Sequence, residues 1–289
     1  MGFFNYDKPG KGISKDAPRK KGIFLYFELL GRKFSKLMCV NMLYFLFSIP
    51  MMLLYFGVFL FVIPTALNIA FGTLDMWQSD ALLSQMFLSL FMTLVCTITL
   101  GTGPASSSMA YVMREFSKEQ HVWLWHNFIK KMKENLKKEI AICMIDLLFI
   151  CFSTIAFAFY LHQYLSSGSL IWFILSFVIA FSSLVFALMH FYIHQLIVTF
   201  ENKLVEIFKN AFLLTLSTLF SCVLLAGFII GVNLYLNITI PALVIPLAFL
   251  VLISFFRFPV EFYVHSVIKK LIPIDENDTK TEEETIFSD

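Results

Sequence analysis

The fold class of this chain is decided by residues 147–200, which read LLFICFSTIAFAFYLHQYLSSGSLIWFILSFVIAFSSLVFALMHFYIHQLIVTF. No Asp, Glu, Lys or Arg interrupts this stretch. A helix needs roughly 20 apolar residues to cross the hydrocarbon core of a bilayer, so the stretch is long enough for two crossings. The segment 162–169, which contains Gly168 and three serines, breaks the apolar run and is the predicted turn between them.

Three more stretches lack charged residues: 37–74, 81–113 and 211–256. Each is long enough to cross a bilayer, and the last divides at the polar segment 233–241. Over the whole chain 58% of residues are hydrophobic and 15% are charged, whereas a soluble domain carries about 25% charged residues. This composition excludes a soluble enzyme, a disordered chain and a disulfide-stapled secreted domain. It predicts an all-α, polytopic membrane protein that has the lipid bilayer as a partner.

The basic residues predict the topology, because Lys and Arg resist translocation and collect in cytoplasmic loops. All 22 lie in residues 1–36, in the segment 114–139, at Lys203 and Lys209, at Arg257 or after residue 268. A hairpin within 37–74 would put the basic segment 114–139 outside, whereas one crossing, tilted or kinked at Pro50, puts it inside. We therefore predict six crossings and two cytoplasmic termini.

The predicted organisation has three parts: a basic cytoplasmic segment (1–36), a six-helix membrane domain (37–268) and an acidic cytoplasmic tail (269–289). The predicted spans are 37–63, 82–113, 140–161, 170–199, 211–232 and 242–264, with interfacial helices near 119–138 and 201–210. Residues beyond 63 are either an exterior segment on the membrane surface or a continuation of the first span.

The segment 119–138 has the pattern of an amphipathic helix. Trp125, Phe128 and Leu136 recur at helical spacing, and lysines occupy the other face. Such a helix either rests on the membrane or docks a partner. A shift of the chain by 75 residues aligns Ala105, Ser107 and Ser108 with Ala180, Ser182 and Ser183. This match indicates either a parallel internal repeat or chance similarity between two membrane hairpins.

Motifs for ATP hydrolysis, phosphoryl transfer and serine or zinc hydrolysis are absent from the sequence, so we predict no enzymatic activity and no cofactor. The five cysteines lie in apolar runs without zinc-ligand spacing, which predicts no metal site. A net charge of +2 is too small to indicate a nucleic-acid partner.

Polar residues inside the predicted spans are the candidate functional residues, because burying a charge in hydrocarbon costs several kcal/mol. Asp146, Arg257 and Glu261 are three of them. They form either structural ion pairs, of Arg257 with Asp146 or of Arg257 with Glu261, or a proton or substrate site. His190 and His194 lie four residues apart and are interpreted as an interfacial pair rather than as metal ligands.

The sequence Gly101-Thr102-Gly103-Pro104 falls inside the second predicted span. Proline removes a backbone donor and disturbs the preceding turn, so this segment predicts either a simple kink or a broken helix. A broken helix exposes polar backbone groups at membrane depth, and many transporters use such groups for binding.

Four motifs resemble one known family: GFFNYDKPGKG (2–12), NMLYFLFSIP (41–50), GTGPASSSMAYVMREF (101–116) and HVWLWHNFIKKMKENLKKE (121–139), with a weaker match at 203–214. The chain is similar to the YesL family, also called DUF624, which comprises bacterial integral membrane proteins of unassigned function. The most specific positions are Gly103, Pro104, Ala105, Arg114, Trp125, Phe128 and Asn135. Short members run almost directly from the Pro50-like position to the Gly-Pro element, whereas this chain inserts residues 51–100.

The resemblance implies a bacterial cytoplasmic membrane location and an association with ABC-type importers of oligosaccharides. On that basis the chain is expected to be a non-enzymatic accessory subunit that contacts importer permease subunits. The alternative is a small transporter or channel with a site at residues 101–104. The sequence leaves the oligomeric state open.

Overall fold

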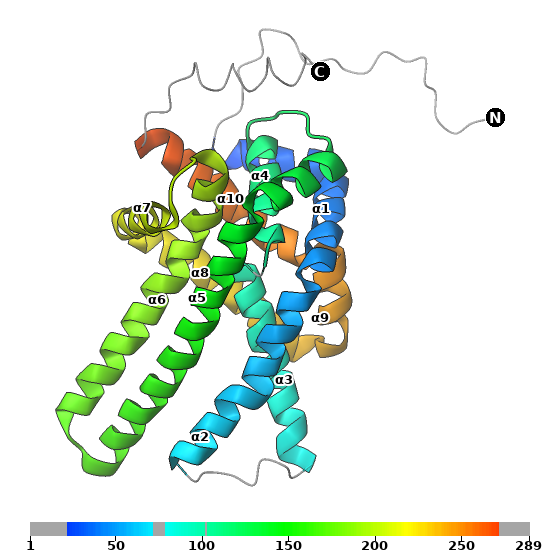
Figure 1. The fold of residues 1–289 in the computed structure, drawn as a ribbon. Helices are drawn as coiled ribbons and strands as arrows, with labels where there is room; N and C mark the ends of the chain where they lie inside the picture. The colour runs from blue at the N-terminus through cyan, green and yellow to red at the C-terminus, as the bar shows by residue number, and fades with distance from the viewer. Residues whose placement is uncertain (1–21, 72–78, 102, 272–289) are drawn as a thin grey trace, which may run out of the picture.

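The computed structural model describes residues 22–71, 79–101 and 103–271 (Figure 1). The elements are α1 (Ile23–Gly57), the π-helical segment η1 (Val58–Val62), α2 (Ile63–Phe71), α3 (Ser79–Thr99), α4 (Ala105–Ser117), α5 (Leu124–Ser167), α6 (Leu170–Thr199), α7 (Leu204–Ser217), α8 (Leu219–Thr239), α9 (Pro241–Leu247), the π-helical segment η2 (Ala248–Leu252) and α10 (Ile253–Leu271). Every element in these ranges is helical, which confirms the predicted all-α class. Most of the predicted terminal segments, 1–36 and 269–289, lies outside the described residues.

Five helices within the described ranges are long and apolar enough to cross a membrane: Ile23–Asn68, Leu124–Ser167, Leu170–Thr199, Leu219–Thr239 and Pro241–Leu271. The chain is therefore polytopic, as predicted. At the second predicted span the structure has only a shorter apolar stretch, Leu88–Thr99, followed by a break before α4. The count of six spans and the internal repeat stay predictions.

The first apolar stretch is one continuous helix, because α1, η1 and α2 follow one another without a turn from Ile23 to Phe71. Pro50 lies inside α1 and does not end it. The described part of the stretch 37–74 thus makes one pass and no hairpin. The helix extends past residue 63, where the first span was predicted to end, and residues 64–71 continue it.

The predicted interfacial helix at 119–138 and the third predicted span at 140–161 form a single helix, α5. The sequence between Leu124 and Ser167 contains neither Gly nor Pro, so nothing in it separates the two. The helix ends at Gly168, whose φ of 67° is left-handed. At 44 residues α5 is about 66 Å long, roughly twice the thickness of a hydrocarbon core, so it extends well beyond the bilayer interior.

The boundary between the second predicted interfacial helix (201–210) and the fifth span (211–232) also differs. Instead of ending near residue 210, α7 continues to Ser217, and α8 follows it after Thr218. The Thr218 hydroxyl donates to the Leu214 carbonyl at 2.8 Å, and this side-chain bond competes with the helical ladder. The sixth predicted span, 242–264, corresponds to α9, η2 and α10 together.

The buried core of the bundle lies at the end where α4 and α10 meet α1, α5 and α6 (Figure 1). Nearly every residue of α4 is buried, as is the part of α6 from Leu188 to Ile197. At the opposite end lie α2, the start of α3 and the turn between α5 and α6 (Figure 1). The molecule therefore has a densely packed end and an end where its long helices are mostly exposed.

Candidate functional site

Six buried ionisable side chains from three helices form the candidate site at the densely packed end. They are Glu139 and Asp146 of α5, His190 and His194 of α6, and Arg257 and Glu261 of α10, and we name this set the polar ladder. Within each helix the two residues are four or seven positions apart, which places them on one face. None of the six is more than 2% exposed. Charges buried to this degree must be paired or neutralised.

The first pair of the ladder joins α5 to α6 through Asp146 and His190. Nε2 of His190 lies 2.9 Å from Oδ1 of Asp146, and Nδ1 lies 2.9 Å from the carbonyl oxygen of Phe186. When Asp146 is ionised, the two oxygens that contact the ring nitrogens, from Asp146 and from Phe186, are therefore both hydrogen-bond acceptors. The geometry requires either a protonated ring beside the carboxylate or a neutral ring beside a protonated carboxyl. In both cases the pair holds one proton more than a neutral histidine and an ionised aspartate.

The second pair repeats this arrangement one turn away along α6. Nδ1 of His194 lies 3.1 Å from Oε1 of Glu139, and Nε2 lies 2.6 Å from the carbonyl oxygen of Leu100. A carbonyl oxygen only accepts, so Nε2 donates, and the contact with Glu139 again requires a shared proton. The pair therefore also holds one extra proton.

These two protons balance the charge of the polar ladder. Glu139, Asp146 and Glu261 contribute three negative charges, and Arg257 contributes one positive charge. Protonation of both pairs adds two positive charges, so the ladder becomes neutral. A neutral set of buried groups is strongly favoured over one with uncompensated charge in a medium of low dielectric constant.

Arg257 and Glu261 form the part of the ladder on α10. Nη2 of Arg257 lies 3.3 Å from Oε1 of Glu261, which is one of the two pairings that the sequence suggested. The other suggested pairing, of Asp146 with Arg257, is replaced by the Asp146–His190 contact. Gln195 of α6 donates to the backbone carbonyl of Glu261 at 3.3 Å and so links the helices that carry the ladder. Arg257 also interacts electrostatically with His190.

The segment 101–104 is a true break between α3 and α4 rather than a kink. Gly101 and Gly103 both have φ of 79°, a left-handed conformation that side chains with a Cβ rarely adopt. The backbone groups freed by the break are bonded by the protein itself: His194 donates to Leu100, and the Gly103 N–H donates to Sγ of Cys143 at 3.2 Å. Pro104 then precedes the first turn of α4. The break therefore lies against the polar ladder and is closed by its side chains.

Arg114 of α4 lies at the end of α6 and satisfies groups that the helix leaves free. Its Nη1 donates to the Val198 carbonyl at 3.0 Å and to the Thr199 hydroxyl at 2.9 Å. Its Nε donates to the Glu115 carboxylate at 3.0 Å. Arg114 is only 7% exposed, so its role within this structure is to hold α4 to α6.

The other predicted residues lie on the first turns of α5. Phe128 is fully buried and its ring stacks on that of Phe47, with centroids 6.1 Å apart. Asn135 is buried and donates to the carbonyl of Lys131 within its own helix at 3.1 Å. Trp125 points the other way and is 63% exposed. Of the predicted candidates, the structure thus brings together Gly101, Gly103, Pro104, Asp146, Arg257 and Glu261, whereas Trp125, Phe128 and Asn135 lie elsewhere.

Sequence reasoning left Glu139 out of the candidate site and did not pair the two histidines with carboxylates. Glu139 follows a run of lysines, so it looked like part of a solvated face. The available signal was its spacing of seven residues from Asp146, which places both on one helical face. Within the described part of the chain, no group of three or more His, Cys, Asp or Glu side chains is arranged to hold a metal ion.

Comparison with known proteins gives one match. Residues 37–160 match the family model described as "Protein of unknown function, DUF624". No curated protein and no solved structure matches the chain. The matched region contains α3, the break at 101–104, α4 and the α5 side of the polar ladder. Over residues 37–160 the match confirms the similarity to the DUF624 family that the sequence motifs indicated.

Proposed function

We propose that this protein is a non-enzymatic accessory subunit of an ABC-type oligosaccharide importer in the bacterial cytoplasmic membrane. The supporting observation is that two backbone groups at the helix break are bonded to side chains of the same chain: the Leu100 carbonyl accepts from His194, and the Gly103 N–H donates to Cys143. A break closed in this way stabilises a rigid bundle rather than offering backbone groups to a substrate. The importer association itself comes from the family resemblance.

The surface most suited to contact a permease subunit lies at the start of α5. Trp123 and Trp125 are 73% and 63% exposed, next to the lysines that form the basic face of the helix. Exposed tryptophans are enriched among residues that contribute most to protein interfaces. We expect the importer subunits to contact these two side chains.

Co-purification tests this proposal. The tagged protein is isolated in a mild detergent from cells that express the neighbouring importer genes, and the permease subunits are measured by mass spectrometry. The wild-type chain is expected to retain them, and the double variant Trp123→Ala/Trp125→Ala to lose most of them. Phe177→Ala, which removes an aromatic side chain that is 63% exposed on α6, is the matched control and is expected to retain them. Failure of the wild type to capture any importer subunit contradicts the proposal.

A second candidate function is a small transporter or channel with its site at residues 101–104. It is favoured by one specific observation: the break contacts the buried ionisable side chains of the polar ladder through His194, and discontinuous helices beside ionisable groups are typical of coupled transporters. Purified protein in vesicles loaded with a pH-sensitive dye tests it. Proton-coupled uptake that is lost in Gly103→Leu supports this function, and vesicles without any flux contradict it.

A further inference from the structure

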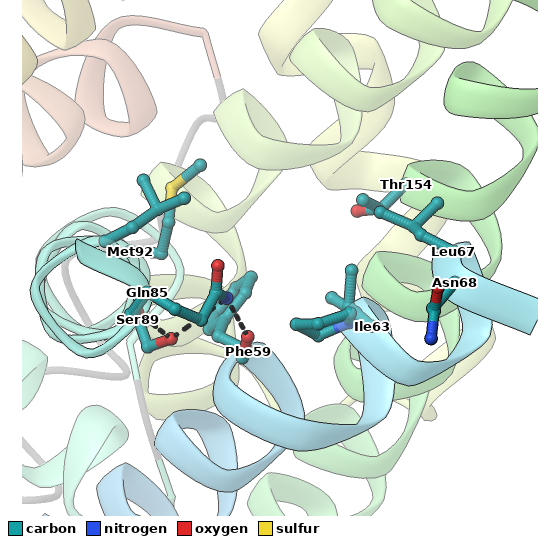
Figure 2. A pocket seen from close by; sticks show the side chains of 10 residues that line it. Phe59, Ile63, Leu67, Asn68, Gln85, Ser89, Met92 and Thr154 are labelled. Atoms are coloured by element: carbon teal, nitrogen blue, oxygen red, sulfur yellow. Dashed lines mark hydrogen bonds between the residues drawn. The ribbon is translucent and has the colours of Figure 1, made fainter. Parts of the chain in front are cut away.

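A cavity of about 300 Å³ lies between α2, α3 and α5, and none of the polar ladder residues lines it (Figure 2). Its lining consists of Phe59, Ile63, Pro64, Leu67, Asn68, Gln85, Leu88, Ser89, Met92 and Thr154. All of these residues belong to the uncharged stretches 37–74, 81–113 and 147–200, from which the membrane-spanning helices are predicted. No charged side chain lines it.

Uncharged polar groups converge on this space from three helices. The side-chain amide nitrogen of Gln85 donates to the Phe59 carbonyl at 2.9 Å, which leaves the amide oxygen directed into the space between α3 and α2 (Figure 2). The Thr154 hydroxyl points into the same space from α5, and Asn68 borders it from α2 (Figure 2). The side chains of Asn68 and Thr154 make no hydrogen bond to any residue that the structure describes.

These groups favour a ligand that supplies hydrogen bonds. A polar group held in an apolar environment without a partner costs about 1–3 kcal/mol, and lipid tails cannot provide the partner. Pockets that bind small molecules have this composition: mostly apolar walls and a few polar groups that fix the orientation of the ligand. At about 30 Å³ for each group the size of a water molecule, the cavity has room for about ten such groups.

We propose that this cavity binds an uncharged lipid. A hydroxyl or ester group of the lipid bonds Asn68, Gln85 and Thr154, and the adjoining hydrocarbon lies against the apolar wall formed by Phe59, Ile63 and Met92. The absence of Lys, Arg and His from the lining disfavours an anionic headgroup, and the absence of Asp and Glu disfavours a cationic one. This binding site is independent of the importer association and of the polar ladder.

Native mass spectrometry of the full chain in detergent tests the proposal. Dioleoylglycerol is added as the uncharged probe, and dioleoylphosphatidylglycerol is added separately as the anionic one. We expect saturable binding of one dioleoylglycerol and weaker binding of the anionic lipid. Thr154→Trp fills the cavity and is expected to weaken dioleoylglycerol binding at least about tenfold. Asn68→Leu/Thr154→Val keeps the volume but removes two polar groups, and a loss of about thirtyfold is expected at about 1 kcal/mol for each lost hydrogen bond.

Phe152→Trp is the matched control, because Phe152 is also on α5 but is 70% exposed and does not line the cavity. It is expected to bind dioleoylglycerol like the wild type. If Thr154→Trp does not fold, the volume-conserving double variant decides the result. The proposal is overturned if the wild type binds no dioleoylglycerol, if the cavity variants bind it as well as the wild type does, or if the anionic lipid binds more tightly.

Discussion

At the level of single residues, the contact between His190 and Asp146 stabilises a carboxylate that is buried away from water. Replacing His190 by leucine leaves Asp146 buried without its partner, so we expect His190→Leu to lower the free energy of unfolding by about 3 kcal/mol. The double variant His190→Leu/Asp146→Leu removes both charges and is expected to recover most of this loss. Thermal unfolding in detergent, followed by tryptophan fluorescence, measures both. If the double variant is less stable than His190→Leu, the loss of stability in His190→Leu does not come from the unpaired Asp146.

At the level of elements, each π-helical segment is met by an amide side chain from another helix. A π-helical turn disturbs the regular bonding of the helix. Asn41 of α1 donates to the carbonyls of Ala248 and Phe249 and accepts from the Ser254 N–H, all at 2.7 Å. Gln85 donates to the Phe59 carbonyl in η1. The two amide side chains thus form hydrogen bonds with backbone groups in and next to the π-helical segments.

This arrangement predicts that the Asn41 amide contributes more to the stability of the protein than an amide that bonds only within its own helix. Asn41→Leu removes three buried hydrogen bonds and is expected to destabilise the protein by roughly 3 kcal/mol, at about 1 kcal/mol for each bond. Asn237→Leu is the matched control, since Asn237 bonds only to Asn233 within α8, and a loss of at most about 1 kcal/mol is expected. Chemical unfolding in mixed micelles measures the difference. Equal losses would mean that η2 does not depend on Asn41.

The break between α3 and α4 makes a second prediction about an element. A Cβ at Gly101 would lie 2.7 Å from Nε2 of His194, in addition to its left-handed φ of 79°. We therefore expect Gly101→Ala to destabilise the bundle by at least about 2 kcal/mol and to displace His194 from Leu100. Gly227→Ala in α8 is the control, because a Cβ added there would meet nothing within 4 Å and alanine favours a helix. The melting temperature is expected to fall for the first variant and to stay or rise for the second; a fall of equal size in both contradicts the prediction.

The elements themselves could be predicted from the sequence more fully than the contacts between them. Long uncharged stretches predict helices because a bilayer interior requires satisfied backbone groups, and Gly101 to Pro104 marked the interruption. The pairing of His194 with Glu139 depends on how α5 and α6 are rotated against each other, which no local pattern specifies.

At the level of the whole molecule, the polar ladder lies at the end that carries the basic residues, and the long helices extend from there to the turn after Ser167 (Figure 1). Positive charge predicts that the ladder end is cytoplasmic, and both functional proposals require it. Lys137 and Ser167 are exposed positions on α5 about 45 Å apart, a distance greater than the roughly 30 Å hydrocarbon core, so they lie on opposite sides of the membrane.

Cysteine labelling of intact cells tests this orientation. In a Cys39→Ser background, which removes the exposed native cysteine, we expect Ser167→Cys to react with a membrane-impermeant maleimide added outside. Lys137→Cys is expected to react only after the membrane is opened, because the positive-inside rule places the start of α5 in the cytoplasm. Each variant is the control for the other, since both sites are exposed on one helix. Reaction of Lys137→Cys in intact cells would place the ladder at the outer surface, where its protons would exchange with the exterior rather than with the cytoplasm.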